Sequence, residues 1–291
     1  MATVPTSAML SGRLSVLAAA FLFSTGGAAI KALTLTSWQV ASFRCAVAAA
    51  ALLLLVPESR RHWSWRILPV AVFYALTLVL FAIANKLTTS ANAIFLQATA
   101  PLYLLLIGPW FLRERVAARD LILAAMIAVG MTLFFVSSDG GSATAPNPAA
   151  GNLLAGITGL TWACTLAGFR WLNRAGEKET GLATAVLGNL LGFLAALPLA
   201  LGDSLRGSGA DAALLLYLGV FQVGAAYAFL SRGMKHVPAF EASALILLEP
   251  ALNPVWSYLV HGERPGGLAL AGGAIIVTAT LWQTWSSRNA V

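Results

Sequence analysis

The sequence predicts an all-α integral membrane protein with ten transmembrane helices arranged as two inverted five-helix repeats. Three observations predict this fold. Hydrophobic residues make up 59% of the 291 residues and charged residues only 10%, whereas a soluble domain usually carries about 25% charged residues. The apolar residues form long runs joined by short connections. A pattern of residues in the first half of the chain recurs in the second half.

Ten runs are long enough to cross a bilayer, for which about 20 predominantly apolar residues are needed. They cover residues 13–32, 37–56, 66–85, 90–111, 117–136, 151–171, 181–201, 212–231, 238–260 and 267–285. The longest connection, residues 137–150, is rich in Gly, Ser, Ala and Pro. We therefore predict a first five-helix repeat at 1–136, an extracytoplasmic linker at 137–150 and a second five-helix repeat at 151–291.

The positive charges predict the orientation, because Lys and Arg favour cytoplasmic loops. With a cytoplasmic N-terminus, thirteen of the 18 Lys and Arg residues fall on inside connections and four on outside ones, and Arg44 lies within the second span. The 137–150 linker contains neither residue type, as expected outside the cell. We predict a multi-pass protein of the cell (inner) membrane with both termini cytoplasmic.

Two offsets align the halves of the chain. The offset of 149 pairs Lys86 with Lys235, Pro101 with Pro250, and Glu114-Arg115 with Glu263-Arg264. The offset of 139 pairs Gly12 with Gly151, Phe23 with Trp162 and Lys31 with Arg170. Each half holds an odd number of predicted spans, so the second copy enters the membrane from the opposite side. Inverted repeats are typical of secondary transporters, which bind substrate near the midplane between the halves.

The repeated unit resembles that of the drug/metabolite transporter superfamily, in its ten-helix EamA branch. The resemblance is carried by Ala-Asn-Lys-Leu-Thr-Thr-Ser-Ala before Pro101 and Glu114, and by Gly-Met-Lys-His-Val-Pro-Ala before Glu249-Pro250 and Glu263. It covers nearly the whole chain and implies a transporter similar to bacterial exporters of amino acids, with the aromatic amino acid exporters nearest. One departure is Phe23-Ser24, where the family often has Trp-Gly.

Polar and aromatic residues inside the spans are candidates for a substrate cavity, because hydrocarbon penalises polar groups that are neither paired nor hydrated. Glu249, near the middle of the ninth span, could bind a substrate ammonium or carry a coupling proton. It could also be a structural carboxylate paired with Arg44. The predicted cavity residues are Tyr74, Asn92, Gln97, Trp162, Gln222, Tyr227 and Glu249. For each aromatic residue, packing or interfacial anchoring is the alternative.

A second set of residues is predicted to have structural or gating roles. Arg44 could bind a substrate carboxylate or hold a carboxylate of the protein. Pro101 and Pro250 each remove a backbone donor within a span, so we expect the resulting breaks to face protein or cavity. Glu114 and Glu263 lie at equivalent span ends and are expected to cap helices or lock gates. The set is Arg44, Pro101, Glu114, Pro250 and Glu263.

These observations favour a secondary transporter that moves small metabolites, amino acids first, across the inner membrane by alternating access. A channel and an intramembrane enzyme remain alternatives, as does a drug or nucleoside exporter. The chain lacks a Gly-Lys pair and hence a P-loop, so it is not a primary pump. We expect no catalytic residue, metal or cofactor. The expected partners are a small-molecule substrate and the bilayer, without nucleic acid, for a monomer or weak homodimer; proton coupling stays open.

Overall fold

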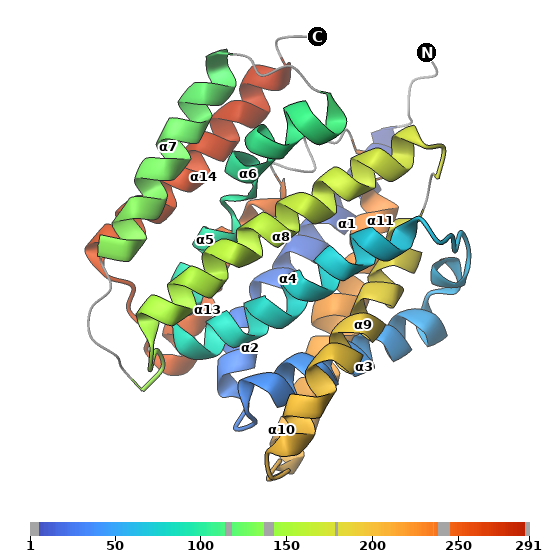
Figure 1. Cartoon of the computed structure of the whole chain (residues 1–291), viewed down its shortest axis with the longest axis vertical. Helices are drawn as coiled ribbons and strands as arrows, with labels where there is room; N and C mark the ends of the chain where they lie inside the picture. The colour runs from blue at the N-terminus through green and yellow to red at the C-terminus, as the bar shows by residue number, and fades with distance from the viewer. Residues whose placement is uncertain are drawn as a thin grey trace.

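The structure is a computed structural model that describes residues 6–113, 118–136, 143–177, 180–234, 236–237 and 245–288. All the regular secondary-structure elements in these ranges are helices (Figure 1). Seven helical stretches are long and apolar enough to cross a membrane. Two shorter apolar helices cover Leu121–Leu133 and Gly267–Ala279. The predicted all-α membrane class is confirmed, and the count of ten spans stays a prediction.

The helices of the first half are α1 (Thr6–Ser24), α2 (Gly26–Ala32), α3 (Ser37–Leu55), η1 (Pro57–Arg60), α4 (Ile67–Leu87), α5 (Ser90–Gln97), α6 (Ala100–Ile107), η2 (Gly108–Leu112) and α7 (Ala118–Val136). Those of the second half are α8 (Pro148–Arg174), α9 (Gly181–Gly202), α10 (Gly209–Leu216), η3 (Tyr217–Ala225), α11 (Ala226–Gly233), α13 (Leu248–His261) and α14 (Gly267–Arg288). The start of α1 and the end of α14 both lie towards the top of Figure 1.

Local sequence signals explain where several helices begin. Thr36 and Gln39 form a reciprocal capping box at the start of α3, and Ser208 and Asp211 form another at the start of α10. Thr89 caps α5 by accepting a hydrogen bond from the Asn92 backbone amide at 3.1 Å. These side chains satisfy amide donors that have no partner within the first helical turn.

Three of the predicted spans are interrupted, and a fourth contains a π-helical segment. Thr25 separates α1 from α2, and a turn at Ala98 and Thr99 separates α5 from α6. The segment η3 is a π-helix between α10 and α11, and α13 begins after a turn at Leu247. Interrupted helices and π segments concentrate at functional sites in transporters. The breaks therefore mark the region where a substrate site is expected.

The two repeat-related prolines, Pro101 and Pro250, lie directly after two of these breaks. Pro101 lies in the first turn of α6 and Pro250 in the first turn of α13. The missing amide of a proline costs little at a helix start, where that donor has no intrahelical partner. Each proline thus follows an existing break and starts a new helix.

The packing brings the two halves of the chain together over most of their length. The helix α4 packs on α8 and α9, α3 packs on α9 and η3, and α1 packs on α11 and α13. The helices α7 and α14 pair with each other at the left of Figure 1. Large apolar side chains such as Leu54, Leu106 and Trp110 are exposed on the outside. A lipid environment accommodates such a surface, which water would not.

Candidate functional site

Four aromatic side chains from both halves meet in the interior, and we call them the aromatic cluster: Phe23, Tyr74, Trp162 and Tyr227. The rings of Tyr74 and Tyr227 lie 5.5 Å apart at 72°, and those of Phe23 and Tyr227 lie 5.2 Å apart at 76°. Both are edge-to-face contacts of favourable geometry. Trp162 and Tyr227 pack against the same group of buried residues, which contains Tyr74. Three predicted cavity residues are thus brought together.

Polar atoms without partners are buried beside this cluster. Among the described residues, the Asn189 Oδ1 and the Arg44 Nε have no hydrogen-bond partner, and the Tyr74 hydroxyl interacts with Asn189 and Tyr227. Tyr74 and Arg44 are each 1% exposed and Asn189 is fully buried. The helix α9 approaches α4 closely here, because a Cβ on Gly188 would lie 2.4 Å from the Tyr74 ring. Buried polar groups are nearly always hydrogen-bonded, so this concentration requires an explanation.

Glu249 borders the aromatic cluster from the first turn of α13. Its side chain is half-buried, and both Glu249 and Arg44 are close enough to Tyr227 to act on it electrostatically. The sequence offered an ion pair between Arg44 and Glu249 as one alternative, and the structure does not form it. The Arg44 Nη2 instead donates to the Leu78 carbonyl oxygen of α4 at 2.9 Å. The guanidinium is therefore held by the neighbouring helix, and Glu249 is left at the edge of the cluster.

A second group of buried polar side chains lies around Gly26 and Gly27 and on the following turn of α13, and we call it the polar layer: Ser90, Gln222, Asn253 and Ser257. A Cβ on Gly27 would lie 2.7 Å from the Asn253 Oδ1 and 2.9 Å from the Ser90 Cβ. A Cβ on Gly26 would lie 2.7 Å from the Gln222 Nε2. The two glycines therefore let three polar side chains approach the start of α2. Ser257 follows one turn after Asn253 on α13.

The sequence predicted Gln222 as a cavity residue but missed the other three members of the polar layer and Asn189. A small polar residue in an apolar run is common, and only the fold shows that these residues are buried in the interior. Asn253 carried the clearest signal, because its amide lies deep in a predicted span one turn after Pro250.

A buried ion pair lies one to two turns beyond the polar layer. The Lys31 Nζ and Glu263 Oε1 are 3.1 Å apart, and the two side chains are only 4% and 3% exposed. The Glu263 Oε2 also accepts a hydrogen bond from the Ser90 amide at 2.8 Å. Lys31 donates to the carbonyl oxygens of Thr88, at 2.7 Å, and Thr144. This Lys31–Glu263 pair ties together α2, the start of α5, the segment before α8 and the end of α13.

A second half-to-half contact closes the same end of the bundle. The Thr34 amide and hydroxyl both donate to the Asp211 carboxylate, each at 2.7 Å. The Gln39 side chain donates to the Ala200 carbonyl oxygen at 3.2 Å. Polar contacts therefore join the two halves at the end that carries Lys31, which we call the Lys31 end.

The remaining predicted residues lie elsewhere. The Asn92 Nδ2 donates to the Asn152 Oδ1 at 3.1 Å, and the Thr88 hydroxyl donates to the same oxygen at 2.7 Å. This network belongs to the Lys31 end and not to the aromatic cluster. Gln97 is half-buried at the end of α5. Glu114 lies outside the described residues. In the part of the chain that the structure describes, no group of His, Cys, Asp or Glu could hold a metal ion.

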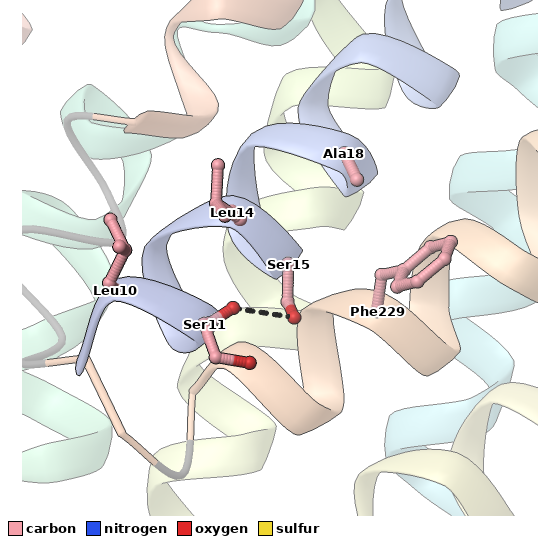
Figure 2. Close-up of a pocket in the computed structure, with 6 residues that line it drawn as sticks. All are labelled: Leu10, Ser11, Leu14, Ser15, Ala18 and Phe229. Carbon is pink, nitrogen blue, oxygen red and sulfur yellow. Dashed lines mark hydrogen bonds between the residues drawn. The ribbon is translucent and has the colours of Figure 1, made fainter. Parts of the chain in front are cut away.

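A groove of about 390 Å³ lies between α1 and α11. Figure 2 shows its lining of Leu10, Ser11, Leu14, Ser15 and Ala18 along α1 and Phe229 on α11. An adjoining hollow adds Arg232 and His236. None of the predicted cavity residues lines either hollow. Because Leu10 and Leu14 are more than half exposed, we assign the groove to the outer surface of the bundle.

Three comparisons relate the chain to known proteins. The sequence profile of the EamA-like transporter family matches residues 10–136 and again residues 149–285. The chain is 26% identical over 283 residues to the Pseudopaline exporter CntI of Pseudomonas aeruginosa strain UCBPP-PA14, covering 93% of this chain and 95% of the exporter. The exporter of strain PAO1 matches equally. A solved crystal structure with 19% identity shares the fold, with a TM-score of 0.63 over 99% of both chains.

Proposed function

We propose, from the premise that the chain belongs to the EamA-like transporter family, that it is a secondary transporter that exports small zwitterionic metabolites by alternating access. Family membership makes it a multi-pass membrane transporter. The substrate class, with amino acids that carry apolar or aromatic side chains first, is our inference. The similarity to an exporter of one metabolite supports export as the direction.

The aromatic cluster is the observation that carries this proposal. Its four rings come from α1, α4, α8 and α11, so both halves of the chain contribute two each. Phe23 and Trp162 are repeat partners, and both belong to the cluster. Aromatic faces suit an apolar side chain, and an ammonium gains about 0.5–2 kcal/mol over such a face. Glu249 adds one carboxylate at the edge, whereas a polyanionic substrate would require clustered cations.

The contacts between helices support two inverted repeats at 1–136 and 151–291. The contact of α4 with α8 has its counterpart in that of α11 with α1, and the contact of α4 with α9 in that of η3 with α3. Two close approaches are also equivalent. A Cβ on Gly12 would lie 2.9 Å from Val237, and one on Gly151 would lie 2.6 Å from Thr88. Both offsets found in the sequence relate these pairs, and the family profile matches twice.

The predicted orientation assigns the Lys31 end to one side of the membrane. With both termini in the cytoplasm, the Lys31 end faces the outside of the cell. The Lys31–Glu263 and Thr34–Asp211 contacts then close the substrate site to the outside, as one state of an alternating-access cycle requires. The equivalent positions at the other end are Arg170 and Glu114, and from the repeat we expect them to serve the opposite gate.

Substrate binding tests the proposed class first. The purified protein is screened by thermal shift against L-phenylalanine, L-leucine, uridine and a cationic dye, and ligands that stabilise it are followed by uptake in liposomes. We expect the amino acids to raise the melting temperature in proportion to ln(1 + [L]/Kd). Stabilisation by uridine or the dye without any response to amino acids would replace the proposed substrate class with a nucleoside or drug exporter.

Glu249→Gln separates the roles of the carboxylate, and Glu58→Gln, on an exposed turn, is the matched control. If Glu249 binds the ammonium, Glu249→Gln weakens binding of L-phenylalanine about tenfold or more. If it carries the coupling proton, the variant still exchanges substrate but no longer responds to a pH gradient. A stable variant that is normal in both assays would leave only a structural role for Glu249.

A further inference from the structure

The polar layer contains more unpartnered hydrogen-bonding atoms than the fold requires. Within the described ranges, neither Nδ2 nor Oδ1 of Asn253 has a hydrogen-bond partner, and the same holds for the hydroxyls of Ser90 and Ser257 and the Oε1 of Gln222. These side chains are 0–6% exposed. Buried polar groups are nearly always hydrogen-bonded, so unpartnered atoms on three separate elements are suited to bind a polar ligand.

The layer lies between the aromatic cluster and the Lys31–Glu263 pair. Along the first span, Phe23 belongs to the cluster, Gly26 and Gly27 face the layer, and Lys31 belongs to the ion pair. At about 1.5 Å of rise per residue, the layer lies roughly 6 Å beyond Phe23 and the ion pair roughly 6 Å further. The Gln222 Nε2 donates to the Phe23 carbonyl oxygen at 3.4 Å and links cluster and layer. Helices α2, α5 and α13 contact one another around it.

The donors and acceptors of the layer select the chemistry of the ligand. The Asn253 Nδ2 can only donate, its Oδ1 and the Gln222 Oε1 can only accept, and the two serine hydroxyls can do either. A lone carboxylate would leave the amide oxygens unpaired. A metal cation would take the oxygens and leave the Asn253 Nδ2 unpaired. A carboxylate with an ammonium beside it matches both kinds of atom.

We propose that the polar layer is the subsite for the amino and carboxylate groups of the substrate, with the aromatic cluster receiving its apolar side chain. This inference rests on the proposed function and specifies how the substrate lies. The carboxylate accepts from the Asn253 Nδ2 and the hydroxyls of Ser90 and Ser257. The ammonium donates to the Asn253 Oδ1 and Gln222 Oε1. Glu249 lies one turn before Asn253 on the same helix and adds negative charge on the ammonium side.

Asn253→Asp tests the subsite because it keeps the size of the side chain but replaces the donor with an acceptor. Binding of L-phenylalanine, phenethylamine and 3-phenylpropionate is measured by thermal shift on the purified protein. We expect Asn253→Asp to weaken L-phenylalanine and 3-phenylpropionate at least tenfold. Phenethylamine, which has no carboxylate, should bind as well as to the wild type or better. A purely structural role would weaken all three probes together, and that result would overturn the subsite.

Two further variants keep the test decisive. Asn85→Asp is the matched control, because Asn85 is equally buried and has one unpartnered amide oxygen among the described residues, yet lies near the end of α4. It should leave the ratio between the probes unchanged. Gly27→Ala places a methyl group against the Asn253 amide and should weaken L-phenylalanine binding without introducing a charge. Unchanged binding in Gly27→Ala would contradict the proposed position of the head group.

The outcomes separate the subsite from the proposed function. Wild-type protein that binds no amino acid would overturn both. Wild-type binding of L-phenylalanine with parallel losses in Asn253→Asp would overturn the subsite alone. A last thermal-shift comparison uses sodium chloride and choline chloride without amino acid. If sodium raises the melting temperature and Asn253→Ala abolishes that rise, the polar layer is a cation site instead.

Discussion

Removing the Glu263 carboxylate should open the Lys31 end of the protein. Glu263→Gln leaves the Lys31 ammonium without its counter-charge at a site where both side chains are almost fully buried. Breaking a buried ion pair by removing one partner costs about 3–5 kcal/mol. If the pair exists only in the state closed at this end, that cost falls on the closed state alone. Since about 1.4 kcal/mol is a factor of ten, the equilibrium should shift about 100-fold or more towards the open state.

Accessibility of residue 90 measures the shift. Ser90 is fully buried directly beneath the pair, and its amide donates to Glu263. A Ser90→Cys reporter is introduced after Cys45 and Cys164 are replaced by alanine, and labelled in cells with a membrane-impermeant thiol reagent. With Glu263 present the labelling should be slow. Glu263→Gln should raise the labelling rate, by about 100-fold or more if the open state is rare when Glu263 is present.

Two controls identify the cause. Arg264→Gln removes the exposed charge next to Glu263 and should leave the labelling rate unchanged. Lys31→Met should accelerate labelling by itself but add little to Glu263→Gln, because both changes remove one interaction and such effects are not additive. A Glu263→Gln protein that melts earlier yet labels at the original rate would refute the gating role and leave the pair as a structural element.

Three further predictions follow from other parts of the structure. A cysteine at Ala143 should react with an impermeant reagent from outside the cell and one at Glu58 should not, both positions being exposed; the reverse pattern would invert the topology. Gly219→Ala should destabilise the protein by about 1–3 kcal/mol through overpacking, since its Cβ would lie 2.4 Å from Val47 and 2.9 Å from the Ala48 nitrogen. Gly209→Ala, with nothing within 4 Å, is its matched control in thermal melting, and equal melting of the two would contradict this packing. Tyr74→Phe removes a buried hydroxyl that interacts with Asn189 and Tyr227, so stability should fall by about 0.5–1.5 kcal/mol while L-phenylalanine uptake falls; an unchanged melting temperature would show that these interactions do not stabilise the fold.

Composition was sufficient to predict the all-α membrane class, and the resemblance of the repeated unit indicated the family. A membrane helix must satisfy its backbone internally and cover it with apolar side chains, so long apolar runs have few alternative structures. The alignment of Phe23 with Trp162 also identified two members of the aromatic cluster as equivalent positions of the two repeats. Repeat partners in inverted halves tend to meet at the interface between those halves, where transporters bind substrate.

Side-chain partners were not predictable in the same way. Arg44 and Glu249 were natural candidates for an ion pair because both are charges inside predicted spans. The choice between Glu249 and the Leu78 carbonyl oxygen depends on how close α3 lies to α4, which the sequence does not encode locally. The pairing of Lys31 with Glu263 depends in the same way on the end of α13 returning to α2. Their positions at span ends were evident, but their contact was not.

The polar layer shows a further limit. In a soluble protein, a polar residue on an apolar stripe is conspicuous because the stripe faces the core. In a membrane helix both the lipid face and the packed face are apolar, so the pattern does not reveal which face carries Asn253 or Ser90. Only the approach of α5, η3 and α13 to Gly26 and Gly27 distinguishes these residues from ordinary small polar residues.

Counterflow in proteoliposomes tests most directly whether the protein is an alternating-access carrier with an amino acid site between its halves. Vesicles are loaded with unlabelled L-phenylalanine and diluted into a trace of labelled L-phenylalanine, without an ion gradient. A carrier should accumulate the label transiently above its equilibrium level, and Asn253→Asp should reduce that accumulation while Asn85→Asp does not. Label that rises only to equilibrium would indicate a channel, and vesicles that take up no more label than protein-free liposomes would contradict the proposed substrate.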